Sequence, residues 1–61
     1  MPLSKAEADL LAKVYEQLGK VKSSALMMAH AQSASDRQEH LRRLSDSLKQ
    51  AASLLGKLEK Q

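Results

Sequence analysis

Two series of apolar residues, each repeating at alternating intervals of three and four, constrain this chain more than any other feature. The first series is Leu11, Val14, Leu18, Val21, Ala25 and Met28, and the second is Leu41, Leu44, Leu48, Ala51, Leu55 and Leu58. Apolar residues at this spacing form a narrow stripe along one side of an α-helix, as in coiled coils. A polar interval from residue 32 to residue 37 separates the two series. The pattern therefore predicts two amphipathic helices.

The composition favours helices over strands. Leu and Ala supply 20 of the 26 hydrophobic residues, and Ile, Phe, Trp and Thr are absent. Strands need β-branched and aromatic side chains to pack a pleated surface, whereas Leu, Ala, Lys, Glu and Gln lose little freedom in a helix. We therefore expect an all-α fold. Two short helices cannot enclose an apolar pocket of substrate size, so we expect no small-molecule substrate.

The distance between the two series favours an antiparallel hairpin of the coiled-coil type. Met28 and Leu41 are 13 positions apart, one short of two heptads, so one continuous helix would lose its stripe here. In a hairpin each member of the first series faces the member of the second whose number brings the sum to 69. The twelve residues would then form the seam between the helices. The polar interval contains no Gly or Pro, so a continuous helix stays open as the alternative.

The capping signals place the helix ends within one unit spanning residues 1–61. Ser4 and Glu7 have the spacing of a capping box, which starts the first helix at residue 5. Ser35 and Asp36 are the candidate caps of the second helix. We expect a first helix over residues 5–32, a turn at 33–35 and a second helix over 36–59.

A single seam encloses its side chains on one side only, which leaves so short a chain near the limit of stability. Small scaffolds add disulfides, metals or partners, and this sequence contains no Cys. We therefore expect a partner protein or a second copy that completes a helical bundle. Beside the seam lie further apolar or small residues, which we predict as the partner or dimer interface: Ala8, Ala12, Tyr15, Gly19, Leu26 and Leu54.

No constellation of residues in the sequence indicates catalysis or a cofactor. There is no nucleophile with a base and an orienting acid, and no glycine-rich phosphate loop. His30 and His40 flank the expected turn, but a metal site needs three or four ligands. We therefore expect no enzymatic activity, no cofactor and no metal.

Basic residues gather on the outer side of the second helix. Arg42, Arg43 and Lys49 are candidate contacts to phosphate groups, although Glu39 and Asp46 interrupt them and the net charge is only +3. A solvated polar face is favoured over a nucleic-acid site.

The apolar runs are too short to enter a membrane, which needs about 20 apolar residues. The first residues do not resemble a secretory signal. We expect a soluble cytoplasmic protein.

The segment Ser47–Leu58 resembles the terminal helix of the small co-chaperones of type III secretion needle subunits. The resemblance implies a two-helix hairpin that binds a helical-repeat chaperone in the cytoplasm. It further implies that contacts are made by Leu48, Ala51, Leu54, Leu55 and Leu58. The overall plan is also similar to plasmid-type RNA-regulating hairpins that dimerise into four-helix bundles.

Together these patterns predict a non-enzymatic protein–protein interaction module. It would act as an adaptor or in a chaperone-like way, presenting an amphipathic helix face to a partner protein. The alternative is a homodimeric four-helix-bundle regulator, of phage or plasmid type, that contacts RNA or a host protein.

Overall fold

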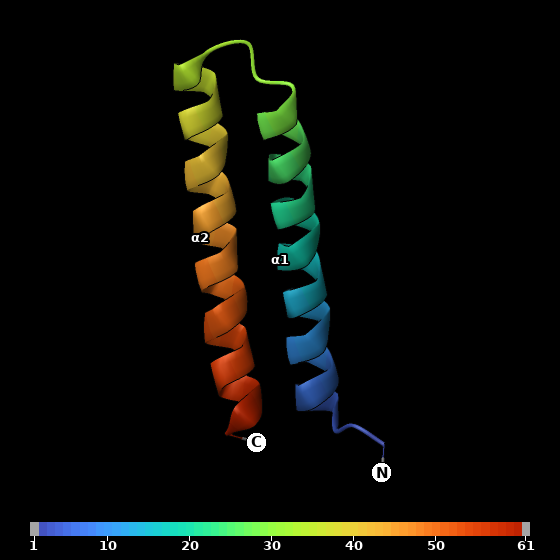
Figure 1. Ribbon diagram of the computed structural model, residues 1–61. Helices are drawn as coiled ribbons and strands as arrows, with labels where there is room; N and C mark the ends of the chain where they lie inside the picture. The colour runs from blue at the N-terminus through green and yellow to red at the C-terminus, as the bar shows by residue number, and fades with distance from the viewer. Residues whose placement is uncertain (1, 61) are drawn as a thin grey trace.

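The computed structural model describes residues 2–60, so residues 1 and 61 of the expected unit lie outside the described range. It contains two helices, α1 (Lys5–Ala29) and α2 (Ala34–Glu59), packed against each other along their length. A short loop joins them at one end, and both termini lie at the other end (Figure 1). The predicted all-α antiparallel hairpin is confirmed, and the continuous helix is excluded. Neither helix described between residues 2 and 60 is long and apolar enough to cross a membrane.

The first helix begins where its capping box predicts. The Ser4 hydroxyl accepts a hydrogen bond from the Glu7 backbone N–H at 3.1 Å, and the Glu7 carboxylate accepts one from the Ser4 N–H at 3.1 Å. Each bond satisfies a backbone donor that the helix itself leaves free. The predicted start of the first helix at Lys5 is therefore confirmed.

The turn lies earlier in the chain than we expected. α1 ends at Ala29, and the His30 N–H closes its last turn by donating to the Met27 carbonyl oxygen at 3.2 Å. The Ser33 hydroxyl accepts from the Asp36 N–H at 3.1 Å and caps α2. The chain therefore reverses over residues 30–33, a few residues before the turn expected at about 33–35, and α2 begins at Ala34. Ser35, predicted as a cap, lies inside the first turn of α2.

The contact surface between the helices is turned by about 50°, half the angle between successive residues, from the predicted seam. Each helix shields a row at alternating intervals of three and four, and the two rows are Leu10, Val14, Gln17, Val21, Ser24 and Met28, and His40, Leu44, Ser47, Ala51, Leu54 and Leu58. Six of the twelve predicted seam residues belong to these shielded rows, namely Val14, Val21, Met28, Leu44, Ala51 and Leu58. The other six, Leu11, Leu18, Ala25, Leu41, Leu48 and Leu55, are more exposed and lie at the edge of the contact between the helices.

The size of this difference is clear from individual side chains. Ser24 is 9% exposed, whereas Leu18 is 49% exposed and Leu48 is 46% exposed. One neighbouring helix covers only part of the circumference of α1, so it can bury the row through Ser24 or the row through Leu18 but not both. In this hairpin the small serines face the neighbour and the leucines face outward.

The observed cap of α2 generates a test. Replacing Ser33 with Ala removes the side-chain acceptor for the Asp36 N–H, so the free energy of unfolding should fall by about 1 kcal/mol. Ser35→Ala is the matched control, because Ser35 lies within the helix and Ala has the higher helix propensity. Urea denaturation followed by circular dichroism measures both. A larger loss from Ser35→Ala than from Ser33→Ala would contradict the observed start of α2.

Candidate functional site

An exposed row of apolar side chains runs along each helix. We call the two rows together the leucine face, which consists of Leu11, Leu18, Ala25, Leu41, Leu48 and Leu55. Its five leucines are between 37% and 49% exposed. They are half covered by their own helices and by the neighbouring helix, and half open to a further partner.

The two rows lie on the same side of the hairpin. Each member follows a shielded position by one residue, as Leu18 follows Gln17 and Leu48 follows Ser47. Each step of one residue rotates the side-chain direction by about 100° about the helix axis, always in the right-handed sense along the chain. Because the helices run in opposite directions and face each other, the same step carries both rows to the same side. The leucine face is therefore one continuous surface, two helices wide.

The residues that border the leucine face are mostly small or uncharged. By the helical period the bordering positions are Ala8, Tyr15, Lys22 and Ala29 on α1, and Gln38, Ser45, Ala52 and Glu59 on α2. Only Lys22 and Glu59 among them carry a charge. The central part of the surface is thus free of charged side chains, as is typical of the core of a protein interface.

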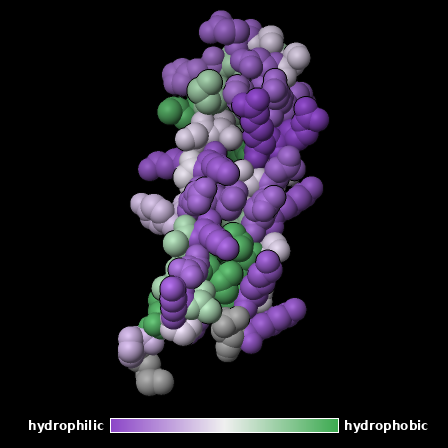
Figure 2. Space-filling model, turned by 180° about the vertical axis from the view of Figure 1, so that it is seen from behind, coloured by the Kyte–Doolittle hydropathy of each residue, from purple (hydrophilic) through white to green (hydrophobic). Residues whose placement is uncertain are grey.

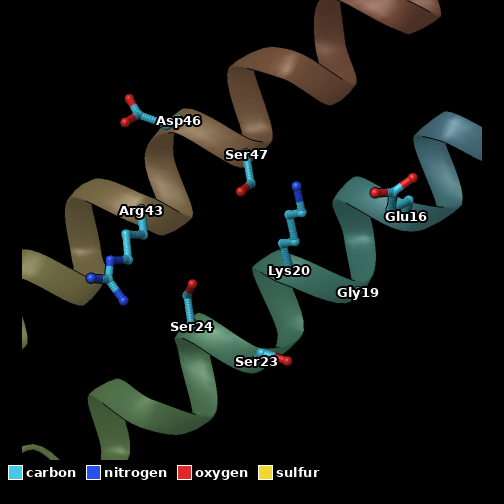
Figure 3. Close-up of a pocket in the computed structure, with 8 residues that line it drawn as sticks. All are labelled: Glu16, Gly19, Lys20, Ser23, Ser24, Arg43, Asp46 and Ser47. Carbon is cyan, nitrogen blue, oxygen red and sulfur yellow. The ribbon is translucent and has the colours of Figure 1, made fainter.

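The opposite side of the hairpin is polar. There an open groove between the helices is lined by Glu16, Gly19, Lys20, Ser23, Ser24, Arg43, Asp46 and Ser47. Lys20 and Ser24 of α1 and Arg43 and Ser47 of α2 extend into the space between the helices, whereas Asp46 points away (Figure 3). A second groove carries Leu10 between Lys13, Lys57 and Lys60.

The surface of the hairpin seen from behind Figure 1 is mainly hydrophilic over both helices (Figure 2). A hydrophobic area interrupts it near the end where the termini lie. The molecule is therefore amphipathic as a whole and not only helix by helix.

The predicted interface residues do not all lie together. Ala8 and Tyr15 border the leucine face, and Tyr15 is 81% exposed. Ala12 and Leu26 are exposed on the side of α1 that points away from α2, and Gly19 is exposed at the edge of the groove between the helices. Leu54 is half-buried and lies in the row of α2 that faces α1.

The spacing of the apolar residues predicts these leucines in the hairpin seam and not in a docking surface. One feature of the sequence does indicate the observed arrangement: polar residues repeat directly before the exposed apolar residues. Gln17, Ser24, His40 and Ser47 repeat there with the small or compact polar side chains that allow two helices to approach.

The three candidate phosphate contacts are not brought together. Arg43 forms an ion pair with Glu39, with 2.9 Å between Nη2 and Oε1. Arg42 lies in a depression beside Glu39, and Lys49 lies in another beside Asp46. Each basic side chain thus has an acidic neighbour, and the arrangement gives no shared site for a phosphate group.

The two histidines are also separate in role. The His40 side chain is 11% exposed, and its Nε2 lies 3.3 Å from Oδ1 of Asp36, one turn earlier on α2. His30 is exposed and provides the C-cap of α1. Across residues 2–60 no group of three or more His, Cys, Asp or Glu side chains is arranged to hold a metal ion.

No protein-family model, curated protein or solved structure matches the chain with significance.

Gly19 tests whether the small-residue side of α1 belongs to an interface. A methyl group added at Gly19 meets no atom within 4 Å in the hairpin. Because Gly is about 1 kcal/mol less favourable than Ala in a helix interior, Gly19→Ala should raise the free energy of unfolding by about that amount. Gly56→Ala is the matched control, since a methyl group there also meets nothing within 4 Å. Calorimetric unfolding that shows destabilisation by Gly19→Ala alone would mean that a partner packs closely against this side.

Proposed function

We propose that this chain is a protein–protein interaction module that works by binding, as an adaptor or in a chaperone-like way, and not by catalysis. Its binding surface is the leucine face, and the proposed occupant is an apolar surface of helical protein. The proposal places the chain in the cytoplasm, where its partner would also be found.

One observation carries this proposal: the hairpin exposes five leucines on one side while it shields serines between its helices. Burying a leucine side chain gains about 1.5–3 kcal/mol relative to full exposure, and the burial of a serine gains much less. A hairpin that acted alone would be more stable if its leucines were buried between the helices and its serines were exposed. If a second protein covers the leucines, their burial in the complex supplies the stability that the hairpin alone lacks.

The surface chemistry favours a protein over a nucleic acid as the partner. Nucleic-acid binding requires a basic patch or stripe that neutralises phosphates. Here Arg43 is paired with Glu39, and the leucine face carries no charge at all. An apolar surface with an uncharged centre is instead typical of the core of a protein–protein interface.

Site-specific photo-cross-linking in cells that express the protein tests the leucine face. We expect p-benzoylphenylalanine in place of Leu48 to form adducts, because this side chain would lie against the partner. The same probe in place of Gln50 is the matched control, since two residues along α2 the helix points to the polar side. Mass spectrometry then identifies the cross-linked protein.

A second pair of probe positions, on α1, tests whether the result at Leu48 holds elsewhere on the leucine face. The probe in place of Leu18 should cross-link, and the probe in place of Lys20 should not. Equal yields from both sides of the hairpin, or no adduct at Leu48 and Leu18, would contradict the proposed function.

A further inference from the structure

We infer that the leucine face is covered by the leucine face of a second copy of this chain, in a four-helix bundle whose two loops lie at opposite ends. This inference rests on the proposed function, because it names the partner of the same surface. Four observations support it: the direction of the apolar stripes, the composition of the layers, the area of the face and the placement of charge.

The apolar stripes point in the direction that a four-helix bundle requires. In such a bundle each helix has two neighbours, and its core residues point between them towards the common axis. Here the stripe on α1 lies partly against α2, through Val14 and Val21, and partly on the open face, through Leu11 and Leu18. The stripe on α2 is divided in the same way. Each helix is therefore oriented for a second neighbour on the leucine side.

The layers of the hairpin can be assigned from its register. In the register that the two apolar series predict, facing residues have numbers that add to 69. The grooves on the polar side group Lys13 with Lys57 and Lys60, and Lys20, Ser23 and Ser24 with Arg43, Asp46 and Ser47, which places the helices within about one turn of that register. The apolar residues on the leucine side then fall into six levels of one residue from each helix. From the open end to the loop these are Leu11 with Leu58, Val14 with Leu55, Leu18 with Ala51, Val21 with Leu48, Ala25 with Leu44, and Met28 with Leu41.

An antiparallel second copy gives every interior layer the same composition. It places the second level of one copy on the fifth level of the other, so that Val14 and Leu55 meet Ala25 and Leu44. It places the third level on the fourth, so that Leu18 and Ala51 meet Val21 and Leu48. Each of these four-residue layers contains two Leu, one Val and one Ala. Equal composition means equal volume, and the core is filled evenly along its length.

A parallel second copy does not give this result, because each level would meet itself. The level of Leu18 and Ala51 would give two Leu and two Ala, and the level of Val21 and Leu48 would give two Val and two Leu. Layers rich in alanine would then alternate with bulkier ones. Packing at uniform density therefore selects the arrangement with the loops at opposite ends.

The area of the face suits a stable dimer. Each helix is about 38 Å long at 1.5 Å per residue, and two helices side by side are about 20 Å wide. The face therefore covers about 760 Å², close to the roughly 800 Å² per partner of a standard protein interface.

The charges agree with this placement. No charged side chain belongs to the leucine face, whereas the opposite side of the hairpin carries charges of both signs, namely Lys13, Glu16, Lys20, Arg43, Asp46 and Lys57. Face-to-face association buries the uncharged side and leaves the charged side in solvent. Tyr15 then lies at the rim, where its ring contacts protein and its hydroxyl reaches water.

Sedimentation equilibrium of the purified chain at micromolar concentration tests the self-association. We expect a species of twice the 6.7 kDa mass of one chain. Leu48→Gln should raise the dissociation constant by about 100-fold, because a two-fold interface contains each substitution twice. Met27→Gln is the matched control on the other side, since Met27 is 50% exposed and Leu48 is 46% exposed. A helical monomer from the unsubstituted chain would overturn the inference.

A distance between the two loops tests the arrangement without altering the leucine face. The chain has no cysteine of its own, so Gln32→Cys gives one spin label in the exposed loop of each copy. Pulsed electron resonance should report about 38 Å or more for loops at opposite ends. A distance of about 10–20 Å, expected for stacked parallel hairpins, would overturn the antiparallel arrangement.

The photo-cross-linking at Leu48 separates failure of this inference from failure of the proposed function. Adducts between two copies of the chain support the inference. Adducts with a different protein alone would overturn it and leave the proposed function standing. The absence of any adduct at the leucine face would overturn both.

Discussion

The apolar stripe lies on one side of each helix, so the rotation of the helix about its axis decides which apolar side chains face the neighbouring helix. In this hairpin that rotation determines which surfaces are apolar and which are polar. The stripes of α1 and α2 point between the neighbouring helix and open solvent, so each is half used by the hairpin. Turning the helices to bury Leu18 and Leu48 completely would expose the serine rows and give a self-contained pair. In the observed orientation Leu18 and Leu48 are only partly buried within one chain. The exposed face, the polar groove and the proposed bundle all follow from it.

The shielded polar row has a function of its own in this arrangement. Ser24 and Ser47 are small enough to let the helices approach, and within residues 2–60 no fully buried side-chain nitrogen or oxygen atom lacks a hydrogen-bond partner. Large apolar residues at these positions would fill both sides of the hairpin with hydrophobic surface. The serines instead keep one side of the hairpin polar. In the proposed bundle they therefore help to restrict association to the leucine face.

The number of helices and their antiparallel course could be predicted from the spacing of the apolar residues, and the start of α1 from Ser4 and Glu7. The rotation of each helix about its own axis could not be predicted. Val14, Val21, Leu44 and Leu58 belong both to the predicted seam and to the observed contact surface, while Leu10 competes with Leu11 for the remaining place. The two solutions differ by a rotation of about 50° about each helix axis, and the spacing of the apolar residues favours neither strongly. The loop was misplaced because Ser33, Ser35 and Asp36 are all good caps, and only the packed helices select among them.

The loop over residues 30–33 has a consequence for how the chain tolerates change. No described residue has a positive φ, so the reversal uses ordinary backbone conformations and needs no glycine. The hairpin is therefore closed by the contact between its helices and not by the chemistry of its turn. Lengthening such a loop has a small entropic cost, about 0.6 kcal/mol for each doubling. The loop end of the molecule is thus the place where evolution or an engineer can insert new sequence while leaving the leucine face intact.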